Sequence, residues 1–569
     1  MKNRSTEEVF KKKAPSFLSP LEAFLYWEKE NPNHLFLQQP INGKLIKYTY
    51  GEAGKELRKV ALKLQSLGLE KKSHIALLSK NCAHWMMSDL AIMMAGFVSV
   101  PIYTSLTSKA IHQVLTHSES KAIIIGKLDD YFSIKDGIPS IPKIGIELYG
   151  IQEEYSWENI IQSETSEITI KFPKLSDIHT IIYTSGTSGN PKGVLHSVGN
   201  FVNSLNTIQK IIKLPSHPRL FSYLPLVHVA ERIIWTYGLT IGAQFSYPES
   251  LKTFAKDLEK SQPHAFFGVP RIWVKFQEII TSKLSQKKLD WLLKTPIIKH
   301  IVIAKLKQKL GLKNSEIIIS GAAPISKDVL HWFKTIDIEI SQIYGMTEDC
   351  CVSHFNLPKA SKIGTVGKVL YNVNAKLSAE GEICIKNPCL MKGYYKDSKK
   401  TSEVMTGEFF HTGDIGEIDS DGFLKITDRK KSMFKTSGGK YVAPQLIENA
   451  MKQSSFIEQI LVVGDGEKMP AALIQPNWEW INQWSTIKGH NISKDTAVAS
   501  QDQKLIDRIQ EEINFHNEGF GSWEKVKTFQ LTPDVWSIDA GHLTPTMKSK
   551  RKVIKEMYKD LYEKLYGRS

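Results

Sequence analysis

A loop rich in glycine and hydroxyl residues carries the strongest chemical signal in the sequence. It reads Tyr183-Thr-Ser-Gly-Thr-Ser-Gly-Asn-Pro-Lys-Gly193 and follows an apolar segment, residues 180–183, that is expected to be a strand. Backbone N–H groups and hydroxyls of such a loop can turn toward a polyphosphate, and Lys192 adds positive charge. The pattern predicts a phosphate-binding loop. A flexible surface linker is the alternative, which the preceding strand and the Pro-Lys-Gly ending disfavour.

The loop differs from the Walker A motif, in which a second glycine, a lysine and a Ser or Thr stand in a row. Pro191 occupies the position of that glycine, and Gly193 follows the lysine where a hydroxyl would bind magnesium. We therefore expect a phosphate loop of another kind.

Further motifs follow this loop along the chain. They are Leu224-Pro-Leu-Val-His-Val-Ala-Glu-Arg232, Ser320-Gly-Ala-Ala-Pro324, Gln342-Ile-Tyr-Gly-Met-Thr-Glu348, Gly393-Tyr-Tyr395, Thr412-Gly-Asp414, Asp428-Arg-Lys-Lys431, Lys435-Thr-Ser-Gly-Gly-Lys-Tyr-Val-Ala-Pro444 and Leu543-Thr-Pro-Thr-Met-Lys548. In this order they resemble the AMP-binding adenylate-forming superfamily, which contains acyl-CoA synthetases, luciferases and peptide-synthetase adenylation domains. The resemblance runs from about Tyr48 to the C-terminus.

The resemblance implies a reaction in two steps. ATP would activate a fatty acid to acyl-AMP with release of pyrophosphate, and the acyl group would then pass to the thiol of CoA. The expected ligands are ATP, Mg²⁺, CoA and the fatty acid. No covalent enzyme intermediate is needed, because the enzyme only has to align the carboxylate with the α-phosphate and stabilise the developing charge.

The resemblance also implies where the nucleotide and the metal bind. Glu348 and Thr184 would hold Mg²⁺, which usually takes few carboxylates together with hydroxyl and phosphate oxygens. Gly321, Gln342 and Tyr344 would line the adenine pocket, and Asp414 would accept hydrogen bonds from the ribose. The whole predicted nucleotide set is Thr184, Ser185, Gly186, Thr187, Ser188, Gly189, Lys192, Gly321, Gln342, Tyr344, Thr347, Asp414, Arg429 and Lys435.

Three residues are expected to be catalytic: Lys548, His228 and Thr347. Lys548 would reach the carboxylate and the α-phosphate from a small C-terminal domain, whereas Thr347 would touch the α-phosphate. The alternative is that Lys548 is one more charge of a basic helix, and Lys550 is the weaker candidate for its role.

The resemblance further implies that the small domain rotates about a hinge at Asp428 between the two steps. Gly438, Gly439 and Lys440 would then serve the thioester step, because glycine has no Cβ and lets a pantetheine arm pass close to the backbone.

The motif around His228, together with residues 269–273, resembles the long-chain fatty acyl-CoA synthetase branch. His228 would close the acyl pocket near the carboxylate. Some relatives gate the acyl tunnel with a tryptophan four residues after this histidine, but Arg232 stands there. Trp235 is the nearest aromatic residue, and for Trp235 and Trp273 ordinary core packing is an equally good interpretation.

The elements that must position these residues alternate between helix and strand. Residues 57–67 have helical spacing and end at Gly68, residues 88–95 and 97–103 suggest a buried helix followed by a strand, and residues 74–78 and 122–125 suggest buried strands. Short strands with glycine turns follow Gly364. We expect an α/β fold with a large N-terminal domain of layered subdomains and a small β-rich subdomain, residues 1–428, and a mobile α+β C-terminal domain, residues 429–569.

The composition narrows the alternatives. The net charge of +15 favours anionic ligands, and a peripheral contact with an anionic membrane is expected on this basis. The five cysteines form no CxxC pair, which fits a reducing cytoplasm, and no signal peptide or nucleic-acid-binding motif is evident. Two other functions stay open: a fatty acyl-AMP ligase or acyl-carrier-protein synthetase, and a non-catalytic basic protein that keeps the fold.

Overall fold

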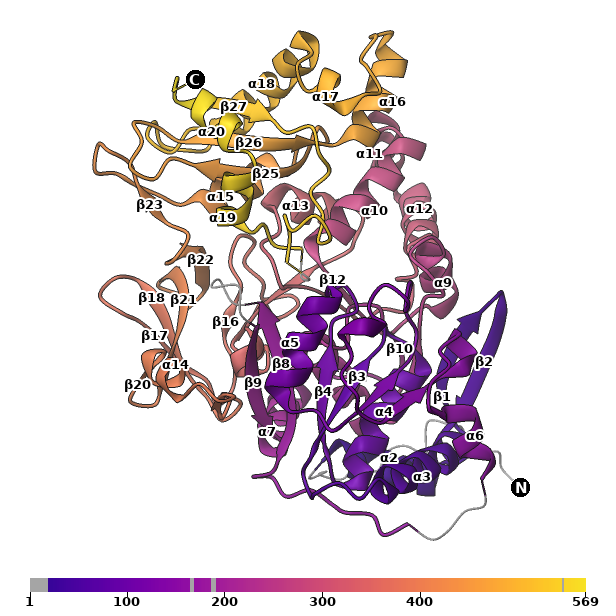
Figure 1. Ribbon diagram of the computed structural model, residues 1–569. Coiled ribbons are helices and arrows are strands. Elements are labelled where there is room, and N and C mark those ends of the chain that lie inside the picture. Colours follow the sequence, from indigo (N-terminus) through magenta and orange to yellow (C-terminus); the bar gives the residue numbers. More distant parts are fainter. Residues whose placement is uncertain (1–18, 164–167, 186–190, 545–546, 569) are drawn as a thin grey trace.

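A computed structural model describes residues 19–163, 168–185, 191–544 and 547–568 of the chain (Figure 1). Two large sheets with helices between them form most of the molecule. A small β-rich sheet adjoins them, and a smaller unit made by the C-terminal part of the chain lies above in the view of Figure 1.

The first large sheet contains the two strands that flank the predicted phosphate loop. Its strand order is β19 (Gly393–Tyr394), β9 (Pro191–Ser197), β8 (Ile178–Ser185), β4 (Val98–Ile102), β3 (His74–Leu78), β5 (Ala122–Ile125), β6 (Lys143–Gly145) and β7 (Tyr155–Ser156). The strands from β8 to β7 run parallel, and β9 returns antiparallel to β8. The predicted phosphate loop therefore joins two strands that are hydrogen-bonded to each other.

The second large sheet positions the adenine and magnesium motifs. Its order is β16 (Lys368–Val369), β15 (His354–Phe355), β14 (Ser341–Tyr344), β13 (Ile317–Ser320), β12 (Ala265–Gly268), β10 (Arg219–Phe221), β11 (Gln244–Ser246), β1 (Leu35–Ile41) and β2 (Lys44–Thr49). The strands from β1 to β14 by way of β10 are parallel. The Ser320 motif therefore begins at the carboxyl end of β13, and the Gln342 motif continues past the carboxyl end of the neighbouring strand β14. Ligands of α/β sheets bind at these ends.

Four helices fill the space between the two sheets. They are α3 (Tyr50–Ser66), α4 (Ala83–Ala95), α7 (Val198–Ile211) and α8 (Val229–Thr240). One core joins α3 and α4 to strands of both sheets, and a second core does the same for α7 and α8. The predicted helix–strand turn near Gly96 is present: α4 ends at Gly96, whose φ of 85° is a left-handed conformation that favours glycine.

The β-rich sheet consists of β17 (Asn374–Leu377), β18 (Glu382–Lys386), β20 (Met405–Thr406), β21 (Phe409–Ile418) and β22 (Leu424–Arg429). After β22 the chain enters the smaller unit through the hairpin of β23 (Phe434–Lys435) and β24 (Tyr441–Val442). This unit has a sheet of β25 (Ile457–Val463), β26 (Ala471–Pro476) and β27 (Thr528–Leu531). The predicted α/β fold class, with its β-rich part and smaller α+β unit, is confirmed.

The remaining helices cover these sheets. They are α2 (Pro20–Glu30), α5 (Ser108–Ser118), α6 (Trp157–Gln162), α9 (Phe254–Ser261), α10 (Pro270–Lys283), α11 (Gln286–Lys294), α12 (Pro296–Lys309), α13 (Lys327–Thr335), α14 (Ser398–Glu403), α15 (Pro444–Met451), α16 (Trp478–Lys488), α17 (Thr496–Ala499), α18 (Gln503–Asn517), α19 (Arg551–Met557) and α20 (Lys559–Leu565). Within the described ranges, none of the helices has the length and apolar character needed to cross a membrane.

Candidate active site

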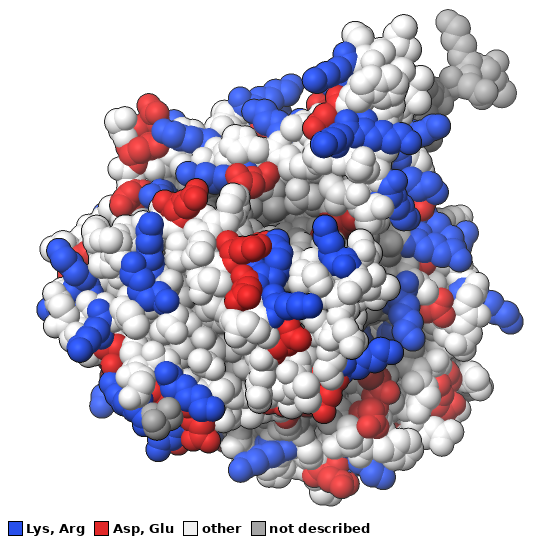
Figure 2. All heavy atoms as spheres, turned by 90° about the horizontal axis from the view of Figure 1, so that it is seen from above, with Lys and Arg blue, Asp and Glu red and all other residues white. Residues whose placement is uncertain are grey.

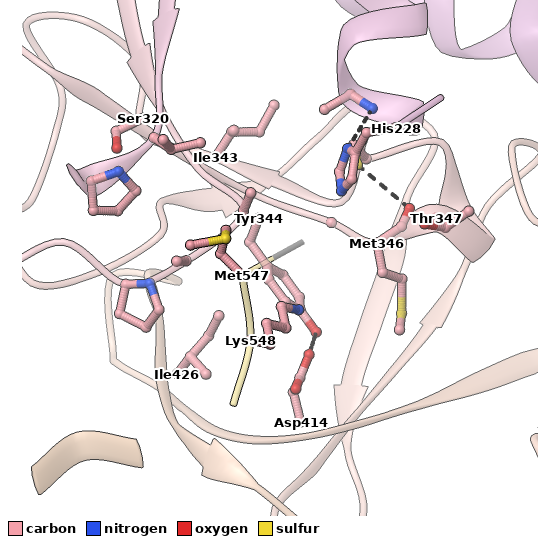
Figure 3. A pocket seen from close by; sticks show the side chains of 18 of the residues that line it. His228, Ser320, Ile343, Tyr344, Met346, Thr347, Asp414, Ile426, Met547 and Lys548 are labelled. Carbon is pink, nitrogen blue, oxygen red and sulfur yellow. Dashed lines mark hydrogen bonds between the residues drawn. The ribbon is translucent and has the colours of Figure 1, made fainter. Parts of the chain in front are cut away.

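A cavity of about 2620 Å³ lies where the two large sheets, the β-rich sheet and the smaller unit meet. Most of the predicted site residues that the structure describes line it, although they come from six separate motifs. Those residues are Thr184, Lys192, His228, Gln342, Tyr344, Thr347, Glu348, Asp414, Arg429 and Lys548. Figure 3 shows several of them around the cavity.

Asp414 is held rigidly at one wall of the cavity. The Tyr344 hydroxyl donates a hydrogen bond of 2.8 Å to Asp414 Oδ2, and Arg429 Nε donates one of 2.8 Å to Oδ1. The antiparallel pairing of β21 with β22 sets Arg429 opposite Asp414. A carboxylate has about four acceptor positions, so Asp414 can still accept hydrogen bonds from two hydroxyl groups of a ligand.

Lys548 enters this cavity from the smaller unit and lies beside Tyr344 and Asp414 (Figure 3). Its backbone turn is closed by a hydrogen bond of 2.8 Å from Thr544 N–H to the Lys548 carbonyl. The pKa of Lys548 is lowered, first by the protein that surrounds it and then by the charge of Arg429, while Asp414 and Glu348 act in the opposite direction. The residue as a whole remains exposed to the cavity.

Three lysines line the cavity close to one another, next to the strand that follows the predicted phosphate loop. They are Lys192, Lys400 and Lys431, and the pKa of Lys192 is lowered to about 8 by burial and by the two neighbouring lysines. Such mutual repulsion is relieved when a polyphosphate binds. Lys400 and Lys431 had no assigned role in the sequence analysis. Lys431 stands in a noted motif, but no local signal marks Lys400 on α14.

Glu348 offers a single carboxylate to a metal ion. Its Oε1 accepts a hydrogen bond of 2.9 Å from the Tyr394 hydroxyl, and Thr184 lines the same cavity. Among the described residues there is no group of three or more His, Cys, Asp or Glu that could hold a metal. One carboxylate and one hydroxyl fit Mg²⁺, because this ion takes its other ligands from phosphates and water.

His228 is the N-cap of α8, and its Nδ1 accepts a hydrogen bond of 3.2 Å from the Ala230 N–H. Burial and the charge of Lys548 lower the pKa of His228 to about 4, so its imidazole is neutral at physiological pH. In Figure 3 the ring faces the cavity near Thr347.

Arg232, one turn further along α8, is completely buried. It forms hydrogen bonds of 2.7 and 2.8 Å with the Asp89 carboxylate and one of 2.9 Å with the Thr180 hydroxyl. Trp235 and Trp273 are also buried and do not line the cavity. Core packing is therefore the correct interpretation for both tryptophans. The hydrogen bonds of Arg232 connect α8 to α4, which contains Asp89, and to β8, which contains Thr180.

The cavity extends into an apolar arm that the sequence analysis did not locate. Its walls are side chains of α7 and α8 and of the strands that face them: Ile208, Ile211, Ile212, Ile233, Ile234, Tyr237, Phe267, Ile319, Ile343 and Phe355. The apolar residues at helical spacing in α7 and α8 are visible in the sequence. Only the packing of both helices against β12–β15 brings these side chains together as a wall of the cavity.

Several predicted residues lie elsewhere. Lys435, Gly438, Gly439 and Lys440 belong to the exposed β23–β24 hairpin and do not line the cavity, and Lys440 Nζ lies 5.6 Å from the centre of the Trp523 ring. Gly321 packs behind the wall, where a Cβ would come within 2.7 Å of Ile343 Cγ2. Gly186, Thr187, Ser188, Gly189 and the Ser185 side chain lie outside the described part of the chain.

Asp428, the predicted hinge, is buried at the end of β22, immediately before the chain enters the smaller unit. Burial raises its pKa to about 6, although its Oδ1 accepts a hydrogen bond from the Arg429 N–H.

Comparison with known proteins gives matches along nearly the whole chain. Residues 24–395 match the family model described as AMP-binding enzyme, and residues 432–569 match the AMP-binding enzyme C-terminal domain. Long chain acyl-CoA synthetase 4 of Arabidopsis thaliana is 29% identical over 92% of this chain and 87% of its own length. Long-chain-fatty-acid–CoA ligase ACSBG2 of Xenopus laevis is 30% identical over 91% of this chain and 80% of its own length.

Solved structures share the fold. The A domain of carboxylic acid reductase from Segniliparus rugosus, determined with AMP and a co-purified carboxylic acid, has a TM-score of 0.77 at 18% identity. The alignment covers 96% of this chain and 94% of that domain.

Proposed function

The chain belongs to the family of AMP-binding enzymes, and from that premise we propose that it is a long-chain fatty acid–CoA ligase. It converts a medium- or long-chain fatty acid and ATP to acyl-AMP and pyrophosphate, and then transfers the acyl group to CoA, which releases AMP. The observation that carries this proposal is one continuous cavity that joins the Asp414–Arg429 wall, the Lys548 ammonium and an apolar arm.

In the first step, the residues of this cavity orient the nucleotide and stabilise charge. Asp414 accepts hydrogen bonds from the ribose hydroxyls, and the Lys192 group neutralises the phosphates. The carboxylate of the fatty acid attacks the α-phosphorus, the bond to pyrophosphate breaks, and Lys548 stabilises the negative charge that develops on the α-phosphate oxygens. Glu348 and Thr184 would hold Mg²⁺, which supplies further charge neutralisation for the leaving pyrophosphate.

The apolar arm accounts for the choice of acid. Isoleucine and aromatic side chains line it, so a hydrocarbon chain gains roughly 0.8 kcal/mol for each CH₂ that it buries there. His228, neutral at physiological pH, lines the same cavity and would border the carboxylate.

For the second step we propose a rotation of residues 429–569 about Asp428. The rotation withdraws Lys548 from the cavity and brings the β23–β24 hairpin, with Gly438, Gly439 and Lys440, to the entry of the CoA thiol. The present position of this hairpin outside the cavity supports a rearrangement between the steps.

A pyrophosphate-release assay with purified protein, ATP and a series of acids from acetate upward tests the proposed function. We expect KM to fall steeply with chain length, and acyl-CoA to form when CoA is the acceptor. A profile that peaks at acetate or at an aromatic acid would contradict the fatty acid assignment. Acyl transfer to a holo-carrier protein but not to CoA would identify the acceptor as the carrier instead.

We also propose that the enzyme contacts an anionic membrane peripherally. The net charge of +15 favours such a contact, and a long-chain fatty acid partitions into the same membrane.

A further inference from the structure

Helices α11 and α12 carry a dense group of basic residues on the outside of the large domain. Between residues 283 and 309 the only acidic residue is Asp290, against Lys283, Lys287, Lys288, Lys294, Lys299, Lys305, Lys307 and Lys309. Lys307 pairs with Asp337 and Lys309 with Glu259, whereas the other six lysines have no ion pair among the described residues. In Figure 2, basic side chains are frequent along the right-hand edge, the side on which α11 and α12 lie in Figure 1.

Large apolar side chains are exposed among these lysines. Trp291 is 61% exposed, Ile297 is 77% exposed and Ile301 is 53% exposed. Lys287, Trp291 and Lys294 stand four and three residues apart, so they share one face of α11, and Ile297, Ile301 and Ala304 share one face of α12 in the same way. Single exposed apolar residues are common on proteins, but a tryptophan and two isoleucines among unpaired lysines are not a typical solvated surface.

The packing of α11 and α12 against the large domain leaves these faces exposed to solvent. Leu289 of α11 and Ile303 of α12 are buried on the opposite sides of their helices, and Leu289 belongs to the core that contains Trp273. Gln286 Oε1 accepts a hydrogen bond of 2.8 Å from Trp332 Nε1 of α13, which holds the start of α11 against the domain. The outward faces are therefore presented by the folded domain itself.

We infer that the α11–α12 surface is the part of the molecule that docks on an anionic lipid bilayer. Tryptophan prefers the interface between lipid headgroups and hydrocarbon, isoleucine can enter the outer hydrocarbon, and lysine can bury its stem while its ammonium stays among anionic headgroups. The inference rests on the proposed use of a long-chain acid. The preceding helix α10 contributes Val274 and Lys275 to the wall of the active-site cavity, so docking through α11 and α12 holds that cavity close to the bilayer.

Co-sedimentation of the full chain with phosphatidylcholine vesicles, with and without phosphatidylglycerol, tests the inference. We expect binding to the anionic vesicles only, decreasing with salt because surface charges are screened. Each lysine near an anionic surface contributes about a fivefold factor, so Lys287→Glu with Lys294→Glu should weaken binding by roughly 25-fold or more. Ile297→Ser with Ile301→Ser keeps the charge and should weaken binding roughly tenfold.

Lys559→Glu with Lys564→Glu is the matched control, because it changes the net charge equally on α20, which belongs to the smaller unit and lies to the left of α11 in Figure 1. It should bind vesicles nearly as the unmodified chain does. Equal loss in the control would show that total charge and not this surface determines binding, and unchanged binding in the α11 variant would overturn the inference. Binding to oligonucleotides without binding to anionic vesicles would overturn it as well.

Pyrophosphate release with octanoate, which is soluble without vesicles, separates this inference from the proposed function. The α11 and α12 variants should retain unmodified rates in this assay. If no acid supports pyrophosphate release by the unmodified chain, the proposed function fails, whereas the vesicle result stands independently.

Discussion

Lys548 is the residue that most directly connects the structure to the first chemical step. The smaller unit contributes the Lys548 ammonium to the part of the cavity that Tyr344 and Asp414 line. Lys548→Ala should lower acyl-AMP formation by a factor of roughly 10²–10³, the usual loss for one well-placed electrostatic contact. Thioester formation from supplied acyl-AMP should persist. Rapid-quench measurement of both half-reactions distinguishes these outcomes.

Two further variants complete this comparison. Lys550→Ala is the matched control, because Lys550 also borders the cavity, and it should leave adenylation nearly unchanged. Gly438→Leu should impair thioester formation alone. Gly438 is preferable to Gly439 here, since Gly439 has a φ of 76° and any side chain would strain the backbone there. Equal loss of both half-reactions in Lys548→Ala would contradict separate arrangements for the two steps.

The buried carboxyl group of Glu231 should make the free energy of unfolding depend on pH. It is buried beside the cavity, and burial raises its pKa to about 8, an effect that hydrogen bonds from Ser222 and the Tyr223 backbone reduce. Between the usual carboxyl pKa and about pH 8, the folded state keeps a proton that the unfolded state has lost. This contribution to stability therefore falls as pH rises through the window, by about 1.4 kcal/mol per pH unit.

Glu231→Gln should remove that dependence. The difference in free energy of unfolding between the variant and the unmodified chain should shift in favour of the variant from pH 5 to pH 8. Denaturant unfolding at several pH values measures it. A difference that stays constant over this range would mean that Glu231 is ionised in the folded protein.

The sequence could predict most of the polar residues that line the cavity because each of these stands in a recognisable local motif. Tyr344 and Asp414 are an example: their motifs are separate, yet both were expected near the nucleotide, and the structure joins them by a hydrogen bond. Lys400 and the apolar arm could not be predicted, since they owe their position to packing between distant segments. The partner of Arg232 is Asp89, at a separation of 143 residues, and no spacing rule reveals such a pair.

At the scale of elements, the buried Arg232–Asp89 pair positions α8, and through it His228. Arg232→Met leaves the Asp89 charge buried without its partner, which should destabilise the protein by about 3–5 kcal/mol. Replacing both residues, Arg232→Met with Asp89→Leu, should restore much of this loss because no isolated charge remains. Denaturant unfolding of the single and double variants tests this. A double variant as unstable as the single one would show that packing volume, and not charge, dominates there.

Strand and helix types were also predictable where the pattern was strong. The buried strand β5 was expected at residues 122–125 and lies there, and the helix expected at residues 57–67 extends back to Tyr50. The earlier start follows from Thr49, whose side chain caps the helix together with Glu52. Periodicity of apolar residues alone does not contain this capping signal.

At the scale of the whole molecule, an ion pair between two residues that line the cavity joins the smaller unit to the large domain. Arg271 of α10 and Glu458 of β25 form an ion pair of 2.5 Å between the two units. The Arg271 side chain is 65% exposed and that of Glu458 is 26% exposed. Because solvent reaches the pair, it contributes about 1 kcal/mol or less and can open without a large cost. A contact of this strength is compatible with the proposed rotation of the smaller unit between the two steps.

A reversible cross-link at this contact provides the most direct test of domain alternation. Arg271→Cys with Glu458→Cys introduces one thiol on each unit, whereas Cys82, Cys350, Cys384 and Cys389 are buried. Cys351 is half-buried and lines the cavity, so it is replaced by alanine in every variant of this experiment, and the Cys351→Ala enzyme is the reference. A short bis-maleimide with a cleavable disulfide would lock the units with Lys548 in the cavity. The locked enzyme should release pyrophosphate once per active site and form no acyl-CoA, and cleavage of the spacer should restore turnover. Each single cysteine variant, treated in the same way, should turn over normally. If the locked enzyme makes acyl-CoA at the unlocked rate, one fixed arrangement serves both steps and the proposed rotation about Asp428 is wrong.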